Sequence, residues 1–162
     1  MKKYKWLLTA LNLIVLLFYF NYSVAEKEEL LQNGRLVLLE LVPVDPRSLM
    51  QGDYMTLRYK ISDDSYHAGL PKRGYCVVRI DACGIAETVR FQQDMLPLNS
   101  GEALIKYHAS DGWNVYIGAE SFFFQEGDAA KYEQAKYGGI KIDSNGNSLL
   151  TGLYDGQRER IE

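Results

Sequence analysis

The stretch from Asp53 to Ile61 reads DYMTLRYKI, and its pattern decides the fold class. Apolar and polar side chains alternate along it, with Met55 and Leu57 on one face and Thr56 and Arg58 on the other. A period of two residues is typical of a strand with one buried and one solvated face. We therefore expect a half-buried strand here, with Met55 and Leu57 clearly more buried than Thr56 and Arg58.

Other segments on both sides of this stretch also have the composition of strands. We expect strands at Leu36–Val42, Tyr75–Asp81, Ile85–Gln92, Glu102–His108, Trp113–Gly118, Glu120–Gln125, Ile140–Asp143 and Ser148–Tyr154. The first of these is apolar on both faces, which is typical of a central, buried strand. Turn sequences separate three pairs of them and predict hairpins, the last with a type I′ turn. These turns are Ala82-Cys83-Gly84, Ser110-Asp111-Gly112 and Ser144-Asn145-Gly146.

One short helix interrupts the strand pattern near the C-terminal end. It should run from about Asp128 to Tyr137, with the Asp128 side chain capping the first turn and Gly138 and Gly139 ending it. Many short strands and one helix predict a mainly β domain, an antiparallel barrel or sandwich.

The segment from Tyr4 to Val24 reads YKWLLTALNLIVLLFYFNYSV. About 20 apolar helical residues span about 30 Å of hydrocarbon. Basic residues lie at the start of the segment and a mainly acidic run follows it; they are Lys2, Lys3, Lys5, Glu26, Lys27, Glu28 and Glu29. Because the basic flank stays in the cytoplasm, the rest of the chain should lie outside. We predict a single-pass anchor in a bacterial-type cytoplasmic (inner) membrane, with lipid around the helix and the domain on the outer or periplasmic side.

Two other interpretations of this segment remain open. Small residues at Ser23-Val24-Ala25 suit cleavage by a signal peptidase, although the bulky aromatic run Phe18–Tyr22 favours an uncleaved helix. A buried core helix is the third interpretation, and the absence of a polar stripe disfavours it. The predicted organisation is an anchor at 1–25, a juxtamembrane helix or linker at 26–34 that Asn33-Gly34 ends, a β-rich domain at 35–156 and a frayed, charged tail at 157–162.

Composition restricts the function classes. The chain has 162 residues, 47% apolar and 24% charged, which is ordinary for a globular protein. The net charge is -3 and no basic stripe follows the N-terminal lysines, so we expect no nucleic-acid partner. The histidines and cysteines lack metal-binding spacing, so we expect no metal and no cofactor. Cys83 sits at a predicted turn and Cys76 several residues down one arm, so they should not bond to each other.

The run Gly52–Tyr59 reads GDYMTLRY and fits the pattern G-D-Y-x-x-L-x-Y at every fixed position. It resembles the motif of the GDYXXLXY family of bacterial membrane-anchored proteins. The approach PVDPRSLMQ at 43–51 and the later blocks FFQEGD at 123–128 and AKYG at 135–138 are similar to that family too. The resemblance implies a membrane-anchored bacterial protein, in a family sometimes encoded beside multi-pass membrane proteins, which makes such a protein a candidate partner. It implies no known substrate.

Carboxylates stand beside glycines at two predicted strand ends. Because strand ends gather at one rim of a barrel or sandwich, we expect the Gly52–Tyr54 turn and the Gln125–Asp128 segment to form one acidic, aromatic-edged surface. The candidate binding residues are Asp45, Arg47, Asp53, Tyr54, Gln125, Glu126 and Asp128. The structural alternative is that each carboxylate only caps its own turn or helix.

These features favour a non-enzymatic binding or assembly subunit that works with an integral membrane partner. The alternative is a small extracytoplasmic hydrolase or ligand-sensing domain that uses Asp53 and Glu126. A serine protease built on Ser48 and Lys60 is disfavoured, because Lys60 alternates onto the solvated face and a lysine base needs burial. We therefore assign no catalytic residue.

Overall fold

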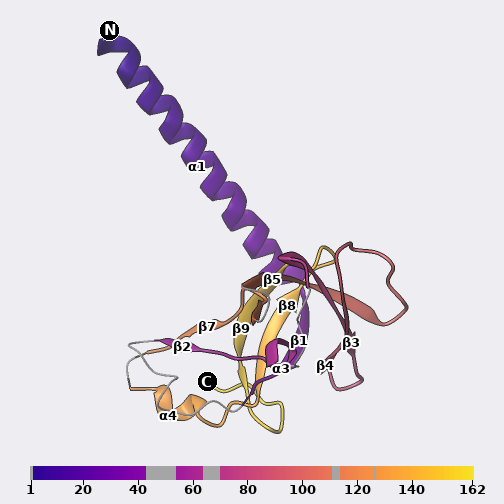
Figure 1. Cartoon of the computed structure of the whole chain (residues 1–162). Coiled ribbons are helices and arrows are strands. Elements are labelled where there is room, and N and C mark those ends of the chain that lie inside the picture. Colours follow the sequence, from indigo (N-terminus) through magenta and orange to yellow (C-terminus); the bar gives the residue numbers. More distant parts are fainter. Residues whose placement is uncertain (1, 43–53, 64–69, 111–113, 126) are drawn as a thin grey trace.

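The computed structural model describes residues 2–42, 54–63, 70–110, 114–125 and 127–162. A long helix, α1 (Lys2–Asn33), extends away from a β-rich domain (Figure 1). Two single-turn helices, α3 (Lys60–Asp63) and α4 (Ala129–Tyr132), lie in that domain. The strands are β1 (Arg35–Glu40), β2 (Tyr54–Thr56), β3 (Arg73–Ile80), β4 (Ala86–Gln92), β5 (Glu102–Ser110), β6 (Asn114–Tyr116), β7 (Ser121–Phe123), β8 (Tyr137–Ile142) and β9 (Ser148–Tyr154).

The strands form three antiparallel sheets, in the orders β1-β8-β9, β2-β7 and β4-β3-β5-β6. A parallel bridge between Leu38 and Ile85 joins the first sheet to the third, and the Leu38 amide donates to the Gly84 carbonyl at 2.9 Å. The predicted mainly β, antiparallel fold is confirmed. The strand in the centre of the first sheet is β8, whereas the sequence predicted a central strand at Leu36–Val42. Among the described strands, β1 pairs along its whole length only with β8.

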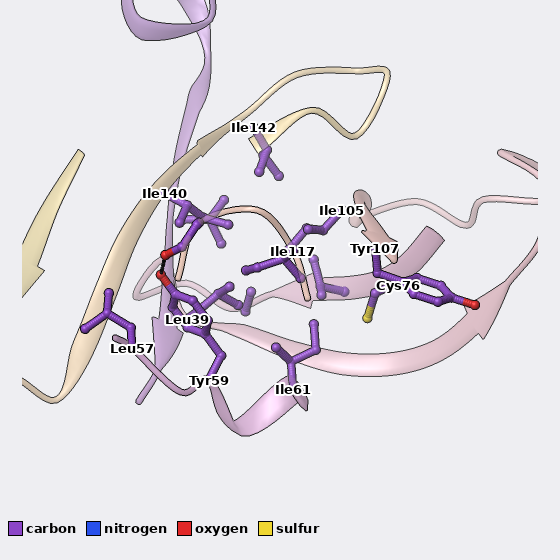
Figure 2. Close-up of a cluster of buried hydrophobic side chains, with 14 of the residues drawn as sticks. Leu39, Leu57, Tyr59, Ile61, Cys76, Ile105, Tyr107, Ile117, Ile140 and Ile142 are labelled. Carbon is purple, nitrogen blue, oxygen red and sulfur yellow. Dashed lines mark hydrogen bonds between the residues drawn. The ribbon is translucent and has the colours of Figure 1, made fainter. Parts of the chain in front are cut away.

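One apolar core lies between the sheets (Figure 2). It includes four alternating side chains, Met55, Leu57, Tyr59 and Ile61. Met55 is 4% exposed and Leu57 5% exposed, whereas Thr56 and Arg58 are exposed. The predicted alternation is therefore confirmed.

The strand is nevertheless shorter than the alternating segment that predicted it. It ends at Thr56, where the pairing of β2 with β7 stops. The Leu57 amide then donates to the Glu120 carbonyl at 2.7 Å, and the Arg58 carbonyl accepts from Val42 at 2.8 Å. These two bonds tie the segment to different parts of the domain, so it connects sheets instead of lengthening one. The α3 turn begins at Lys60, and the sequence did not predict it.

The helix expected at Asp128–Tyr137 is only the single turn of α4, and its end was placed wrongly. Tyr137, Gly138 and Gly139 lie in β8. Because the two glycines have no side chain, the aromatic rings of Tyr59 and Tyr154 can pack against their backbone. Asp128 precedes the first turn but makes no side-chain cap hydrogen bond.

The hairpins β3–β4, β5–β6 and β8–β9 are confirmed by their pairing. Of the turns, Ser110-Asp111-Gly112 lies partly outside the described residues. The β8–β9 turn is not type I′, because that turn needs positive φ at two central residues and only Gly146 has it.

A recurring turn explains this difference. At Asp81, Asp143 and Asp155 the carboxylate Oδ1 accepts the backbone N–H groups two and four residues ahead, at 2.8–2.9 Å. The residue three positions ahead has positive φ each time, and these residues are Gly84, Gly146 and Arg158. The aspartate side chain thus organises a three-residue reversal.

The third of these turns folds the C-terminal residues back onto β9. The Ile161 amide donates to the Leu153 carbonyl at 2.9 Å, and Arg160 donates through Nη2 to the Thr151 carbonyl at 3.0 Å. The expectation of a frayed tail is therefore wrong at these positions. Cys76 is buried, Cys83 is exposed, and the predicted absence of a bond between them is confirmed.

Candidate functional site

Most of the acidic surface expected from the sequence falls outside the described residues, namely Asp45, Arg47, Asp53 and Glu126. Among the described positions, β2 pairs with β7 so that Tyr54 faces Phe123, two residues before Gln125. The shared acidic surface and the hydrolase or sensing alternative stay predictions.

Asp128 has a structural partner. Its Oδ1 lies 3.0 Å from Nζ of Lys131, one turn further along α4. Lys60, the other residue considered for chemistry, lies 3.0 Å from the Glu40 carboxylate, and both side chains are more than half exposed. Neither lysine is in the dry environment that a lysine base requires.

The described part of the G-D-Y-x-x-L-x-Y motif has a structural role. Tyr59 is fully buried, and its hydroxyl donates to the Ala119 carbonyl at 2.6 Å. Burial raises the pKa of this phenol. Its ring lies directly over the backbone of Gly138, where an added Cβ would stand 2.7 Å from Cε1. The motif's Leu and second Tyr therefore fill the core and join three segments of the chain.

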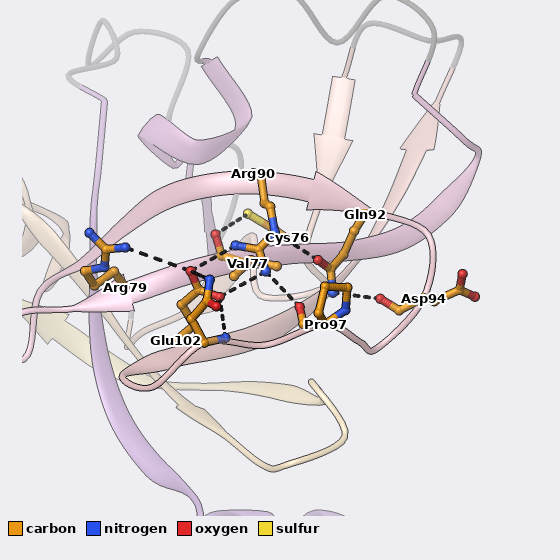
Figure 3. Close-up of polar contacts among 9 residues, drawn as sticks. Cys76, Val77, Arg79, Arg90, Gln92, Asp94, Pro97 and Glu102 are labelled. Carbon is orange, nitrogen blue, oxygen red and sulfur yellow. Dashed lines mark hydrogen bonds and ion pairs between the residues drawn. The ribbon is translucent and has the colours of Figure 1, made fainter.

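An ion pair between partly exposed Arg90 of β4 and the buried carboxylate of Glu102 joins β4 to the start of β5 (Figure 3). The Glu102 carboxylate is 1% exposed and accepts both terminal nitrogens of Arg90 at 2.9 Å. It also accepts the backbone amide and side-chain amide of Asn99, at 2.9 and 3.1 Å. Arg90 further donates to the Pro97 carbonyl at 2.8 Å. These bonds fasten residues 97–102 to the outer face of the sheet.

The same contacts stabilise the ionised form of Glu102. The hydrogen bonds from Arg90 and then from Asn99 lower the pKa of Glu102 to about 2. A bidentate guanidinium–carboxylate pair is planar and directional, so it fixes a loop more firmly than a single contact would. The Arg90–Glu102 pair thus positions the β4–β5 connection, which includes the groove residue Leu98.

A groove of about 770 Å³ lies in the corner between α1 and the domain. The helix contributes Tyr22, Glu26, Glu29 and Asn33 to one wall. The domain contributes Leu98, Leu104 and the Asp143–Asn145 turn to the lining. The groove was not predicted from the sequence, although the four helical residues follow one another at spacings of three or four residues, which places them on one face of a helix.

The groove is acidic. Glu26 and Glu29 make no ion pair with any described residue, while Arg35 is the cationic side chain in the lining. Glu102 and Asp143 add two further carboxylates to the lining. Arg90 and Asn99 donate to Glu102, and the amides of Asn145 and Asn147 donate to Asp143. Such a corner favours a basic group over an acidic one.

The end of α1 is fixed to the domain. Leu30 is 5% exposed, and the Gly34 amide donates to its carbonyl at 2.9 Å. Lys141 of β8 donates through Nζ to the Leu31 carbonyl and lies 3.4 Å from that of Gln32. A cation placed at the open carbonyls of a helix C-terminus is stabilising.

Within the described residues, no three His, Cys, Asp or Glu side chains gather as metal ligands do. The helix α1 contains a segment, Tyr4–Asn33, that is long and apolar enough to cross a membrane.

A family model described as "GDYXXLXY protein" matches residues 16–153 of the chain. Comparisons with curated proteins and with solved structures found no match.

Proposed function

The chain belongs to the GDYXXLXY family, and on that premise we propose that it is a single-pass, membrane-anchored binding or assembly subunit. Its β-rich domain stands on the outer side of a bacterial cytoplasmic membrane and works there with an integral membrane protein.

The flanking charges of α1 support this topology. Lysines at positions 2, 3 and 5 lie at the start of the apolar segment, and the run that follows it has glutamates at 26, 28 and 29 and one lysine at 27. Basic residues are retained on the cytoplasmic side of a membrane. The domain that follows α1 therefore belongs on the opposite side.

The observation that carries the proposal is the fixed junction between α1 and the domain. A domain that binds a soluble substrate needs only a flexible linker to its membrane anchor. Here Leu30 is buried against the domain and Lys141 binds the last carbonyls of the helix. This junction holds the groove at Glu26 and Glu29 beside the point where the helix leaves the bilayer, which is where an integral membrane partner is within reach.

Site-specific photo-crosslinking in intact membranes tests the proposal. A photoreactive residue replaces Glu29 in the groove, and the matched control carries it at Glu133, an exposed glutamate at the end of α4. Figure 1 shows α4 at the end of the domain far from α1. We expect Glu29 to give one adduct, with a peptide of an integral membrane protein, and Glu133 to give none. Equal labelling at both positions, or adducts with soluble proteins alone, would contradict the proposal.

A further inference from the structure

We propose that α1 is itself a binding surface: inside the bilayer one face of it packs against a transmembrane helix of another protein, and the outer end of that helix carries Lys or Arg and docks at the acidic groove. This inference rests on the proposed function and identifies the partner of the same groove.

Asn12 provides the first argument. It lies in the middle of the apolar segment, where an unpaired carboxamide is costly. The polar residues nearer the two ends of that segment satisfy themselves: Thr9 donates to the Lys5 carbonyl at 2.9 Å, and Asn21 donates to the Leu17 carbonyl at 2.8 Å. Asn12 has no hydrogen bond to any described residue. Polar side chains at such depth characteristically face another helix and bond across to it.

The position of Asn12 on the helix provides the second argument. Asn12, Tyr19, Glu26 and Asn33 recur at seven-residue intervals, and Glu26 and Asn33 line the groove. A seven-residue repeat drifts by only about 20° per repeat around a straight helix. A partner helix that crosses at about 20° follows this drift. One neighbouring helix can therefore contact Asn12 at mid-depth and reach the groove at its outer end.

Charge identifies the occupant. A second copy of this chain would enter the membrane in the same orientation, because the same lysines set its topology. Its Glu26 and Glu29 would then stand against the same residues of the first copy, and like charges repel. A helix of another protein with basic residues at its outer end is attracted instead. A groove of about 770 Å³ has room for the side chains that end such a helix.

The first experiment compares two faces of α1 in intact membranes. A photoreactive residue replaces Val15, which continues the three-and-four-residue spacing from Asn12 to Tyr19, or Leu17, which points to the other side. Both side chains are exposed in the isolated chain. We expect Val15 to give an adduct whose partner peptide, mapped by mass spectrometry, is a membrane-spanning segment with Lys or Arg at its outer end. Leu17 should give at least several-fold less of it.

The second experiment removes the carboxamide. Asn12→Leu should lower the Val15 adduct about three- to tenfold, the size of one interhelical hydrogen bond. Asn21→Leu should leave it unchanged, because the Asn21 amide is already bonded within α1. Asn12→Gln keeps a carboxamide and should restore most of the yield. Protection of Cys76 from maleimide confirms that each variant is folded.

The outcomes separate the two proposals. Adducts from Glu29 with none from Val15 would overturn the helix-pairing inference and leave the assembly function standing. An adduct between two copies of this chain, or equal yields from Val15 and Leu17, would also overturn the inference. No adduct from Glu29 or Val15 would reject both.

Discussion

The ring of Tyr59 lies against the backbone of Gly138, and an added Cβ there would stand 2.7 Å from Cε1 and 3.0 Å from the hydroxyl oxygen. Tyr59 cannot move away, because it is fully buried and bonded to the Ala119 carbonyl. One residue of the family motif therefore requires a glycine far along the chain, in the central strand of the β1-β8-β9 sheet.

Gly138→Ala should destabilise the domain by about 1–3 kcal/mol, the usual cost of overfilling a packed core. The urea midpoint of the full chain in detergent measures this, with maleimide labelling of the buried Cys76 as the signal for unfolding. Gly156→Ala is the control, because its new methyl would meet only the flexible Lys136 side chain. Equal midpoints for the two variants would show that the Tyr59 contact is not a constraint.

Arg158 occupies the position of positive φ (69°) that Gly84 and Gly146 fill in the other two aspartate turns. A residue with a Cβ pays about 1–2 kcal/mol there, and glycine adds about 0.5–1 kcal/mol of chain entropy to the unfolded state. We expect Arg158→Gly to stabilise the domain by about 0.5–1 kcal/mol. Gln157→Gly, at the preceding residue, adds the same freedom without relieving strain and should destabilise it. A lower midpoint for both variants would contradict this explanation.

The Arg90–Glu102 pair makes stability depend on pH. The pKa of Glu102 is about 2 in the folded chain, against 4.5 for an ordinary glutamate. Because the folded-state pKa is the lower one, the contribution is complete above about pH 4.5 and is lost as the pH falls towards 2. The urea midpoint should therefore drop across that window, and Glu102→Gln should have a lower midpoint at pH 7 with a smaller drop.

Glu87→Gln is the control for this pH dependence, since Glu87 is an exposed carboxylate on β4, the strand that carries Arg90. It should keep both the midpoint at pH 7 and the full acid drop. A Glu102→Gln variant with the same pH profile as the parent chain would show that the ion pair does not set the acid sensitivity.

The sequence predicted the parts of the fold that depend on local pattern. Alternation at Met55 and Leu57 gave the buried face, and the turn residues gave the β3–β4 and β8–β9 hairpins. It failed where distant contacts decide. Gly138 and Gly139 have the local character of a helix end, yet they lie in a strand because the rings of Tyr59 and Tyr154 need the space. Asn145-Gly146 has the local pattern of a type I′ turn. The Asp143 carboxylate instead accepts the backbone amides of Asn145 and Asn147 and so gives a different turn, which the pattern alone does not show.

The candidate site was less predictable than the fold. The groove exists because the end of α1 is fixed by Leu30 and Lys141, whose partners are far apart in the sequence. The glutamates at its edge were read only as the charged flank of a membrane segment. Whether these glutamates line the groove depends on which face of α1 turns towards the domain, and tertiary contacts determine that.

The two cysteines report both folding and topology. Cys83 is exposed at the β3–β4 turn, whereas Cys76 is buried, and burial raises the pKa of the Cys76 thiol to about 12. The thiolate is the form that reacts, so a maleimide at pH 7 should label one thiol in the folded chain and two after denaturation. If the domain is extracytoplasmic, a membrane-impermeant maleimide added to spheroplasts should label Cys83 fully without lysis. Cys83→Ser should abolish that labelling, whereas Cys76→Ser should leave it unchanged. Labelling that appears only after lysis would place the domain in the cytoplasm and reverse the topology, while two reactive thiols in the folded chain would contradict the core position of Cys76.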